Sequence, residues 1–140
     1  MAMYTASQDP ARSTCAHCWQ RAFPGRADQA AAVRRFVAFL LADHRKADDA
    51  VQAVAELVAN ALQHTMSARP GGSFVVEVRR WCDGRAAISV TDQGGLTEPR
   101  CGEPDYLAGR GRGLYLIAAT ATWWGWRGDA TGRTVTALFT

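Results

Sequence analysis

Glu56 and Asn60 are the first pair of side chains whose types and spacing could do chemistry. Residues four apart are separated by about 40° around a helix, so these two side chains share one side of it. A carboxylate there could accept a proton, and an amide oxygen one turn away could bind a hard cation such as Mg²⁺. Gln52 and Gln63 share that side, so a hydrated polar face is the competing interpretation.

Asp92 stands immediately before Gln93-Gly94-Gly95, at the end of a segment that predicts a β-strand. An Asp that ends a strand before glycines often does no more than form a turn. The alternative is a recognition carboxylate, because the backbone can come close to a ligand at Gly94. Asp92 could then accept a hydrogen bond from the exocyclic amino group of a base.

A segment that alternates glycine with arginine runs directly into a predicted helix. Its residues are Gly109, Arg110, Gly111, Arg112, Gly113 and Leu114. The N–H groups at a helix start favour anions, glycines let a phosphate approach the backbone, and arginines add cationic forks. A Walker loop is excluded because Gly-Lys-Ser/Thr is missing, and a dinucleotide fingerprint because Leu114 stands where Gly or Ala is needed. A flexible glycine-rich hinge is the competing interpretation.

Two further features are weaker. Gly132-Arg133-Thr134 opens the last predicted strand and by itself indicates only a turn. The spacing Cys15-Ala16-His17-Cys18 could begin a zinc site or a redox pair, but the other two cysteines form no second close pair. Ordinary reduced thiols are the favoured interpretation of all four cysteines.

Amphipathic helices must position the first of these groups. The earlier helix follows an expected N-cap at Asp28, and its apolar residues recur at helical spacing: Ala32, Val33, Phe36, Val37, Leu40 and Leu41. After a polar turn at 43–46, the second helix is expected from about 48 to 64. Its buried stripe should be Val51, Val54, Leu57, Val58, Ala61 and Leu62. A third, shorter helix is expected over about 113–121.

Strands supply the rest of the framework. A first strand is expected over 15–23, before Pro24-Gly25, and segments 74–81 and 86–91 predict a hairpin around Asp83-Gly84. Segments 122–127 and 133–139 predict a second hairpin around 128–132. The irregular stretch 93–108 has the length of a lid or binding loop. This order of elements predicts an α+β two-layer sandwich, with a mostly antiparallel sheet and the helices on one face.

The composition and charge of the chain exclude several classes of function. Of the 140 residues, 48% are hydrophobic, and 16 Lys+Arg against 13 Asp+Glu give a net charge of +3. We expect one domain over residues 15–140 after a flexible tail over 1–14. The charge is too small for a nucleic-acid-binding surface, and no window approaches the roughly 18 apolar residues of a membrane span or forms a signal peptide. A cytoplasmic protein without a nucleic-acid or membrane partner is expected.

Taken in order, four segments resemble the asparagine box and the three glycine boxes of the GHKL ATPase superfamily, which includes gyrase, Hsp90, histidine kinases and MutL. They are ELVAN (56–60), DQG (92–94), GRGRG (109–113) and GRT (132–134). The resemblance covers about residues 18–139. The phrases AVAELVANALQHT and GRGLYLIAATATWWG are similar to the stand-alone bacterial anti-sigma factors, which are serine/threonine kinases of the RsbW type.

This resemblance implies a Bergerat-type ATP-binding fold and a role for each matching residue. Asn60 would bind Mg²⁺ through its side-chain oxygen, Glu56 would be the general base, and Asp92 would bind the adenine amino group. Gly94 would let the base approach, and Thr134 would lie near the adenine. The remaining ATP-binding residues would be Gly109, Arg110, Gly111, Arg112, Gly113 and Leu114, with Gly111 and Gly113 holding the phosphates beneath a lid.

The resemblance also implies protein partners. The protein would sequester a sigma factor and phosphorylate a serine on an anti-anti-sigma protein of the STAS type, and it could form a homodimer as its relatives do. The alternative function is a nucleotide-dependent protein-binding module that transfers no phosphate. One position departs from the family pattern, because Leu96 stands at the second glycine of the first glycine box and Gly95 comes one residue early. This departure bears on lid geometry and turnover more than on nucleotide binding.

Overall fold

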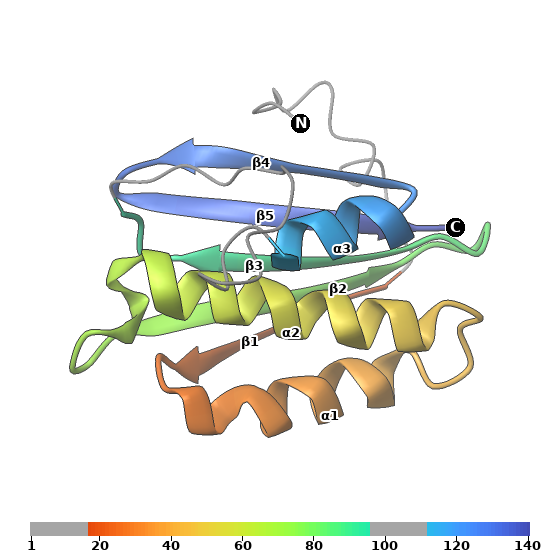
Figure 1. Cartoon of the computed structure of the whole chain (residues 1–140). Helices are drawn as coiled ribbons and strands as arrows, with labels where there is room; N and C mark the ends of the chain where they lie inside the picture. The colour runs from red at the N-terminus through yellow and green to blue at the C-terminus, as the bar shows by residue number, and fades with distance from the viewer. Residues whose placement is uncertain (1–16, 96–111) are drawn as a thin grey trace.

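The computed structural model of the protein describes residues 17–95 and 112–140. Within these ranges, five strands form one antiparallel sheet in the order β1-β2-β3-β5-β4, and three α-helices cover one of its faces (Figure 1). This confirms the α+β sandwich that the sequence predicts. The expected tail over 1–14 and most of the expected lid lie outside the described residues.

The sheet is built from two hairpins and an added edge strand. β1 (His17–Pro24) pairs along its length with β2 (Ser73–Arg80), which turns around Asp83-Gly84 into β3 (Ala86–Asp92). Gly84 has a φ of 92°, as a tight turn at this point requires. β4 (Trp123–Asp129) and β5 (Gly132–Phe139) form the second hairpin, and β5 joins the sheet by pairing with β3.

The helices follow the apolar periodicity of the sequence. α2 (Ala47–His64) and α3 (Arg112–Thr120) lie within one residue of the expected ranges. α1 (Ala30–Leu40) begins two residues after Asp28 and ends before the turn expected at 43–46. The expected N-cap role of Asp28 is wrong. Asp28 lies inside a 3₁₀ turn (Ala27–Gln29), and its carboxylate accepts a hydrogen bond from Arg26 Nε at 3.1 Å instead of capping α1.

The main core lies between the helices and the sheet. It includes most of the apolar stripes expected for α1 and α2, and each large aliphatic residue that it buries completely contributes about 1.5–3 kcal/mol. Its least exposed large side chains are Phe23, Phe74, Phe139, Leu41, Ile88, Ile117, Val33, Val37, Val54, Val58, Val76 and Val78. None of the helices in residues 17–95 and 112–140 is long and apolar enough to cross a membrane.

The register of the two central strands decides which side chains face the helices. Successive residues of a strand point to opposite faces, so Ile88, Val90 and Asp92 of β3 face the helix layer. The residues between them face the outer side of the sheet, where Ser89 and Thr91 form hydroxyl pairs with residues of β5. Asp92 is therefore the last β3 residue on the helix side.

Candidate functional site

Asp92 ends β3 as a carboxylate that is mostly removed from solvent. The residue is 9% exposed, and its Oδ1 accepts a hydrogen bond from the backbone N–H of Gly94 at 2.7 Å. Burial raises the pKa of the Asp92 carboxyl, while backbone N–H groups of Gly94 and Arg133 and the positive charge of Arg133 lower it, and the net shift is upward. An ionised carboxylate only accepts hydrogen bonds, whereas a protonated carboxyl also carries one O–H donor.

Gly94 packs against the turn between β4 and β5. Its φ is 84°, in the left-handed region, and a Cβ there would overlap the carbonyl oxygen of Ala130 and lie 2.5 Å from its carbonyl carbon. The backbone of the turn thus fills the space beside this α-carbon. Close packing against the turn explains why a glycine is needed at position 94, whereas the sequence analysis suggested that the glycine lets a base approach.

The end of β3 is also fixed to the end of α2. The N–H of Met66, in the 3₁₀ turn after α2, donates to the Gly94 carbonyl at 2.8 Å, and the N–H of Gln93 donates to Ser67 Oγ at 3.0 Å. A Cβ on Gly95 would overlap the carbonyl oxygen of His64, the last residue of α2. Strand, helix and hairpin turn therefore meet around Asp92.

Glu56 and Asn60 lie on the half of α2 that leads to this junction. Both are half-buried, and they stand beside Leu57 and Ala61, which belong to the core. By contrast, Gln52 and Gln63 are exposed. Glu56 and Asn60 are therefore less accessible to solvent than the two glutamines that share their side of α2.

The start of α3 lies on the same side of the sheet. α3 contacts α2, and Leu114 in its first turn is buried in the core at 5% exposure. In Figure 1, α3 begins level with the middle of α2. The sequence-predicted residues Gly109, Arg110 and Gly111 lie outside the described residues.

Thr134 is not brought to Asp92. In the pairing of β3 with β5 it stands opposite Thr91, and the two Oγ1 atoms are 2.8 Å apart on the outer face of the sheet. The residue opposite Asp92 is Arg133, which is 5% exposed, with its guanidinium carbon 5.7 Å from the centre of the Trp126 ring. Sequence reasoning missed Arg133. Arg133 stands two residues before the apolar Val135, and this alternation is the feature of the sequence that indicates the helix side of the strand for both.

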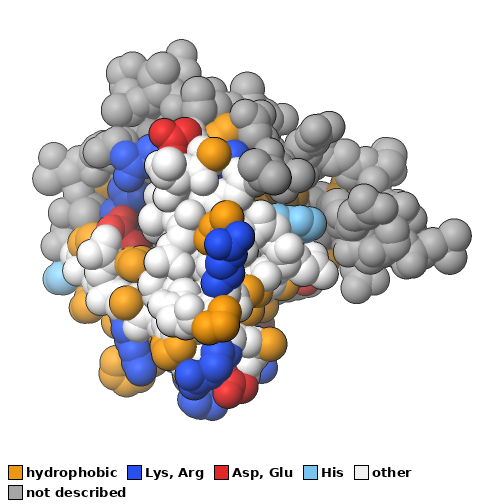
Figure 2. All heavy atoms as spheres, turned by 90° about the vertical axis from the view of Figure 1, so that its left-hand side faces the viewer, with side chains coloured by type: hydrophobic (Ala, Val, Ile, Leu, Met, Phe, Trp, Pro, Cys, Tyr) orange, Lys and Arg blue, Asp and Glu red, His pale blue; other side chains and the backbone are white. Residues whose placement is uncertain are grey.

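The surface around this junction carries no continuous basic patch among the described residues. Figure 2 views the molecule from the end at which α2 finishes and β4 turns into β5, and its Lys and Arg side chains form separate groups divided by uncharged ones. Among residues 17–95 and 112–140, there is also no group of three His, Cys, Asp or Glu side chains that could hold a metal ion.

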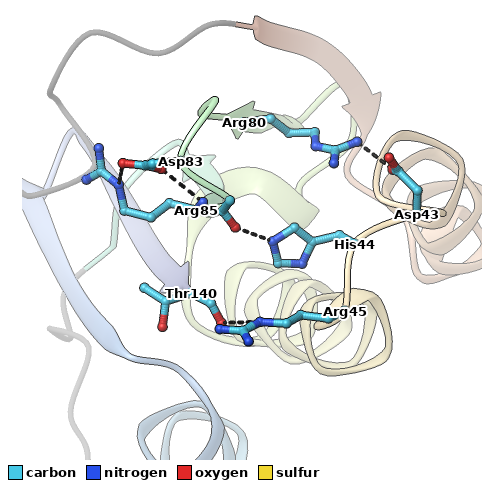
Figure 3. Close-up of a pocket in the computed structure, with 8 residues that line it drawn as sticks. Asp43, His44, Arg45, Arg80, Asp83, Arg85 and Thr140 are labelled. Carbon is cyan, nitrogen blue, oxygen red and sulfur yellow. Dashed lines mark hydrogen bonds and ion pairs between the residues drawn. The ribbon is translucent and has the colours of Figure 1, made fainter.

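A separate cavity of about 600 Å³ lies at the other end of β3, between the β2–β3 turn and the α1–α2 turn (Figure 3). Its charged groups bind one another or the backbone: Arg80 pairs with Asp43 at 2.6 Å and Arg85 with Asp83 at 2.9 Å. His44 Nε2 lies 2.8 Å from the carbonyl oxygen of Gly84. These contacts join two turns of the fold.

Comparison with known proteins gives the class of domain. The family described as the histidine kinase-like ATPase domain matches residues 23–139. The protein therefore belongs to this family, as its four sequence boxes indicated.

A solved structure confirms the fold. The protein is similar to the crystal structure of the RsbU and RsbW domains of Rv1364c from Mycobacterium tuberculosis, with a TM-score of 0.67 and 23% sequence identity. The similarity covers 88% of this chain and 32% of that one, so this chain spans about a third of the length of its relative.

Proposed function

We propose that the protein is an ATP-binding anti-sigma regulatory factor, which sequesters a sigma factor and phosphorylates a serine on an anti-anti-sigma partner of the STAS type. The observation that carries the proposal is the junction at Asp92. A buried carboxylate meets the end of α2 and the β4–β5 turn on the helix side of the sheet, within a histidine kinase-like ATPase domain.

Asp92 is suited to bind the amino group of adenine. The backbone N–H of Gly94 binds Oδ1 and so fixes the plane of the carboxylate. The second oxygen can then accept a hydrogen bond from a base, and in a site of low polarity a charge-assisted hydrogen bond of this kind is about twice as strong as a neutral one. An adenine presents a donor there, whereas the corresponding position of a guanine is an acceptor and would be repelled.

The residues on α2 fit a magnesium–nucleotide complex. The half-buried amide of Asn60 offers one hard oxygen ligand, and Mg²⁺ commonly takes its other ligands from phosphate oxygens and water. Magnesium bound there would supply positive charge to the phosphates. The N–H groups at the start of α3, which lies against α2, would bind the phosphates directly.

Glu56 would act as the general base, one helical turn from Asn60. Its carboxylate would take the proton from the partner's serine hydroxyl as that oxygen bonds to the γ-phosphorus of ATP. The bond from the γ-phosphorus to the β–γ bridging oxygen breaks, and ADP leaves. Most of the rate enhancement in such a transfer comes from positioning and charge neutralisation.

The proposal is tested with γ-labelled ATP, Mg²⁺ and a STAS-type partner. Wild-type protein should label the partner, and Glu56→Ala should bind ATP as before while losing the transfer. Gln52→Ala is the matched control, because Gln52 is an exposed residue one turn earlier on the same side of α2. Equal loss of binding and transfer in Glu56→Ala would contradict its role as the base. A wild-type protein that binds ATP without labelling the partner would be the binding module instead.

A further inference from the structure

Arg133 carries a positive charge on the buried side of β5. The strand alternates, so Arg133 shares the helix side with Val135 and Ala137, which are core residues. Only 5% of Arg133 is exposed. Burying a cation is costly unless other groups stabilise it, so its retention at this position needs a physical reason.

Two neighbours supply that reason. The guanidinium carbon of Arg133 lies 5.7 Å from the ring centre of Trp126, which is itself 5% exposed, and the face of an indole ring attracts a desolvated cation. The second neighbour is Asp92, directly opposite in the register. The backbone N–H of Arg133 binds the Asp92 carboxylate, and the charge of Arg133 lowers the Asp92 pKa against the upward effect of burial.

Other titratable groups stand on α2 and β4, the elements that lead to the junction at the end of β3. Glu56 and His64 are on α2, and Asp129 is at the end of β4. His64 and Asp129 are exposed, and the one charge among the causes that act on the Asp92 pKa is that of Arg133. Burial has the largest effect on the Asp92 pKa and raises it, and the charge of Arg133 opposes that rise from the strand position directly opposite.

We propose that Arg133 is a positioning residue for base recognition: from the opposite strand position, its buried charge favours the ionised form of the Asp92 carboxylate, which accepts a hydrogen bond from the exocyclic amino group of a purine. The inference rests on the proposed nucleotide site. Without the arginine, a protonated Asp92 would present an O–H donor to an amino group that is also a donor. Without the arginine this protonated form would persist to a higher pH, so the fraction of Asp92 able to accept the hydrogen bond would begin to fall at a higher pH than in wild-type protein.

The first experiment needs no nucleotide. The side-chain ¹³C resonance of Asp92 is titrated by NMR in wild-type protein and in Arg133→Met, Arg133→Lys and Arg127→Met. Arg127 is the matched control, because it is an exposed arginine of the same hairpin and pairs with Thr134 on the outer face. We expect the midpoint to rise in Arg133→Met, to stay near the wild-type value in Arg133→Lys, and to be unchanged in Arg127→Met.

The second experiment measures ATP affinity against pH in the same variants by calorimetry. Affinity falls by about tenfold per pH unit below the Asp92 midpoint when binding requires the ionised form. The fall should begin at a higher pH in Arg133→Met than in wild-type protein. If wild-type protein fails to bind ATP, the proposed function fails, while the Asp92 titration still decides whether the charge of Arg133 lowers the Asp92 midpoint.

A lowered melting temperature in Arg133→Met with an unmoved Asp92 midpoint would overturn the inference, because it would show a structural role alone. If Arg133→Met does not fold, Arg133→Gln is titrated in its place. In wild-type protein the ¹⁵Nε resonance of Arg133 must also follow the titration of Asp92. An Nε resonance that shows no inflection at that midpoint would contradict the coupling.

Discussion

Replacing Gly94 with Ala imposes two separable costs on the junction between β3 and the β4–β5 turn. The first is conformational, because a φ of 84° lies in the left-handed region and costs a residue with a side chain about 1–2 kcal/mol. The second is steric, because the new Cβ would overlap the carbonyl oxygen of Ala130 and lie 2.7 Å from the carbonyl carbon of Thr131. Both neighbours are backbone atoms, so the turn itself must move.

Gly71 provides a control that isolates the steric cost. Its φ is 78°, close to that of Gly94, but nothing lies within 4 Å of the position that a Cβ would take. Gly71→Ala therefore has the conformational cost without the steric one. Both alanine variants also gain about 0.4–1 kcal/mol of stability, because alanine makes the unfolded chain less flexible. The difference between the two variants is the cost of forcing extra volume into a packed site, about 1–3 kcal/mol.

Thermal unfolding followed by circular dichroism measures this difference. At this chain length, 1 kcal/mol corresponds to a change in melting temperature of about 3–4 °C. Gly94→Ala should therefore melt about 3–12 °C below Gly71→Ala. Equal melting temperatures for the two variants would refute the close packing of Gly94 against the turn, and with it the explanation of why glycine is needed there.

Three further predictions concern single side chains. Asp92→Asn should lose ATP affinity at pH 7 without losing stability. Burial raises the folded-state pKa of Asp92, so ionisation of this group destabilises the fold as the pH rises through that pKa. Urea unfolding should therefore show that any gain in stability of the variant over wild-type protein vanishes below about pH 3.9, where Asp92 is protonated in both folded and unfolded protein. Thr134→Val should change the ATP affinity measured by calorimetry by less than about twofold, because the Thr134 hydroxyl faces Thr91 on the outer side of the sheet. A large loss of affinity would show that Thr134 contributes to the site. His44→Ala should lower the unfolding free energy by about 1–3 kcal/mol, because both ring nitrogens are hydrogen-bonded, while ATP affinity is unaffected; a cost no greater than that of the exposed control His64→Ala would contradict this role.

The sequence was sufficient for the elements whose patterns are local. The 3.6-residue spacing predicted α1 and α2, and the turn residues at Asp83-Gly84 predicted the β2–β3 hairpin. The N-cap of α1 was less predictable, because the Asp28 carboxylate binds Arg26 and the chain forms a 3₁₀ turn before the helix. A capping residue and a turn residue look alike until their hydrogen-bond partners are known.

The site was less accessible to sequence reasoning, because its contacts join distant segments. The pairing of β3 with β5 decides that Arg133, rather than Thr134, stands opposite Asp92, and a shift of one residue exchanges the two faces. The contact of Gly94 with Ala130 likewise depends on how two loops meet in space. That Glu56 and Asn60 share one side of α2 was predictable from their spacing, because one helix fixes their relation.

The central claim is that separate segments form one site for an adenine nucleotide at the Asp92 end of β3. The most direct test is to add ATP and Mg²⁺ to ¹⁵N-labelled protein and map the changes in backbone amide shifts. We expect the changes to gather at the end of β3, at the half of α2 that carries Asn60 and at the start of α3. Shifts that gather instead around the β2–β3 turn at Gly84, or a spectrum that ATP leaves unchanged, would contradict the claim.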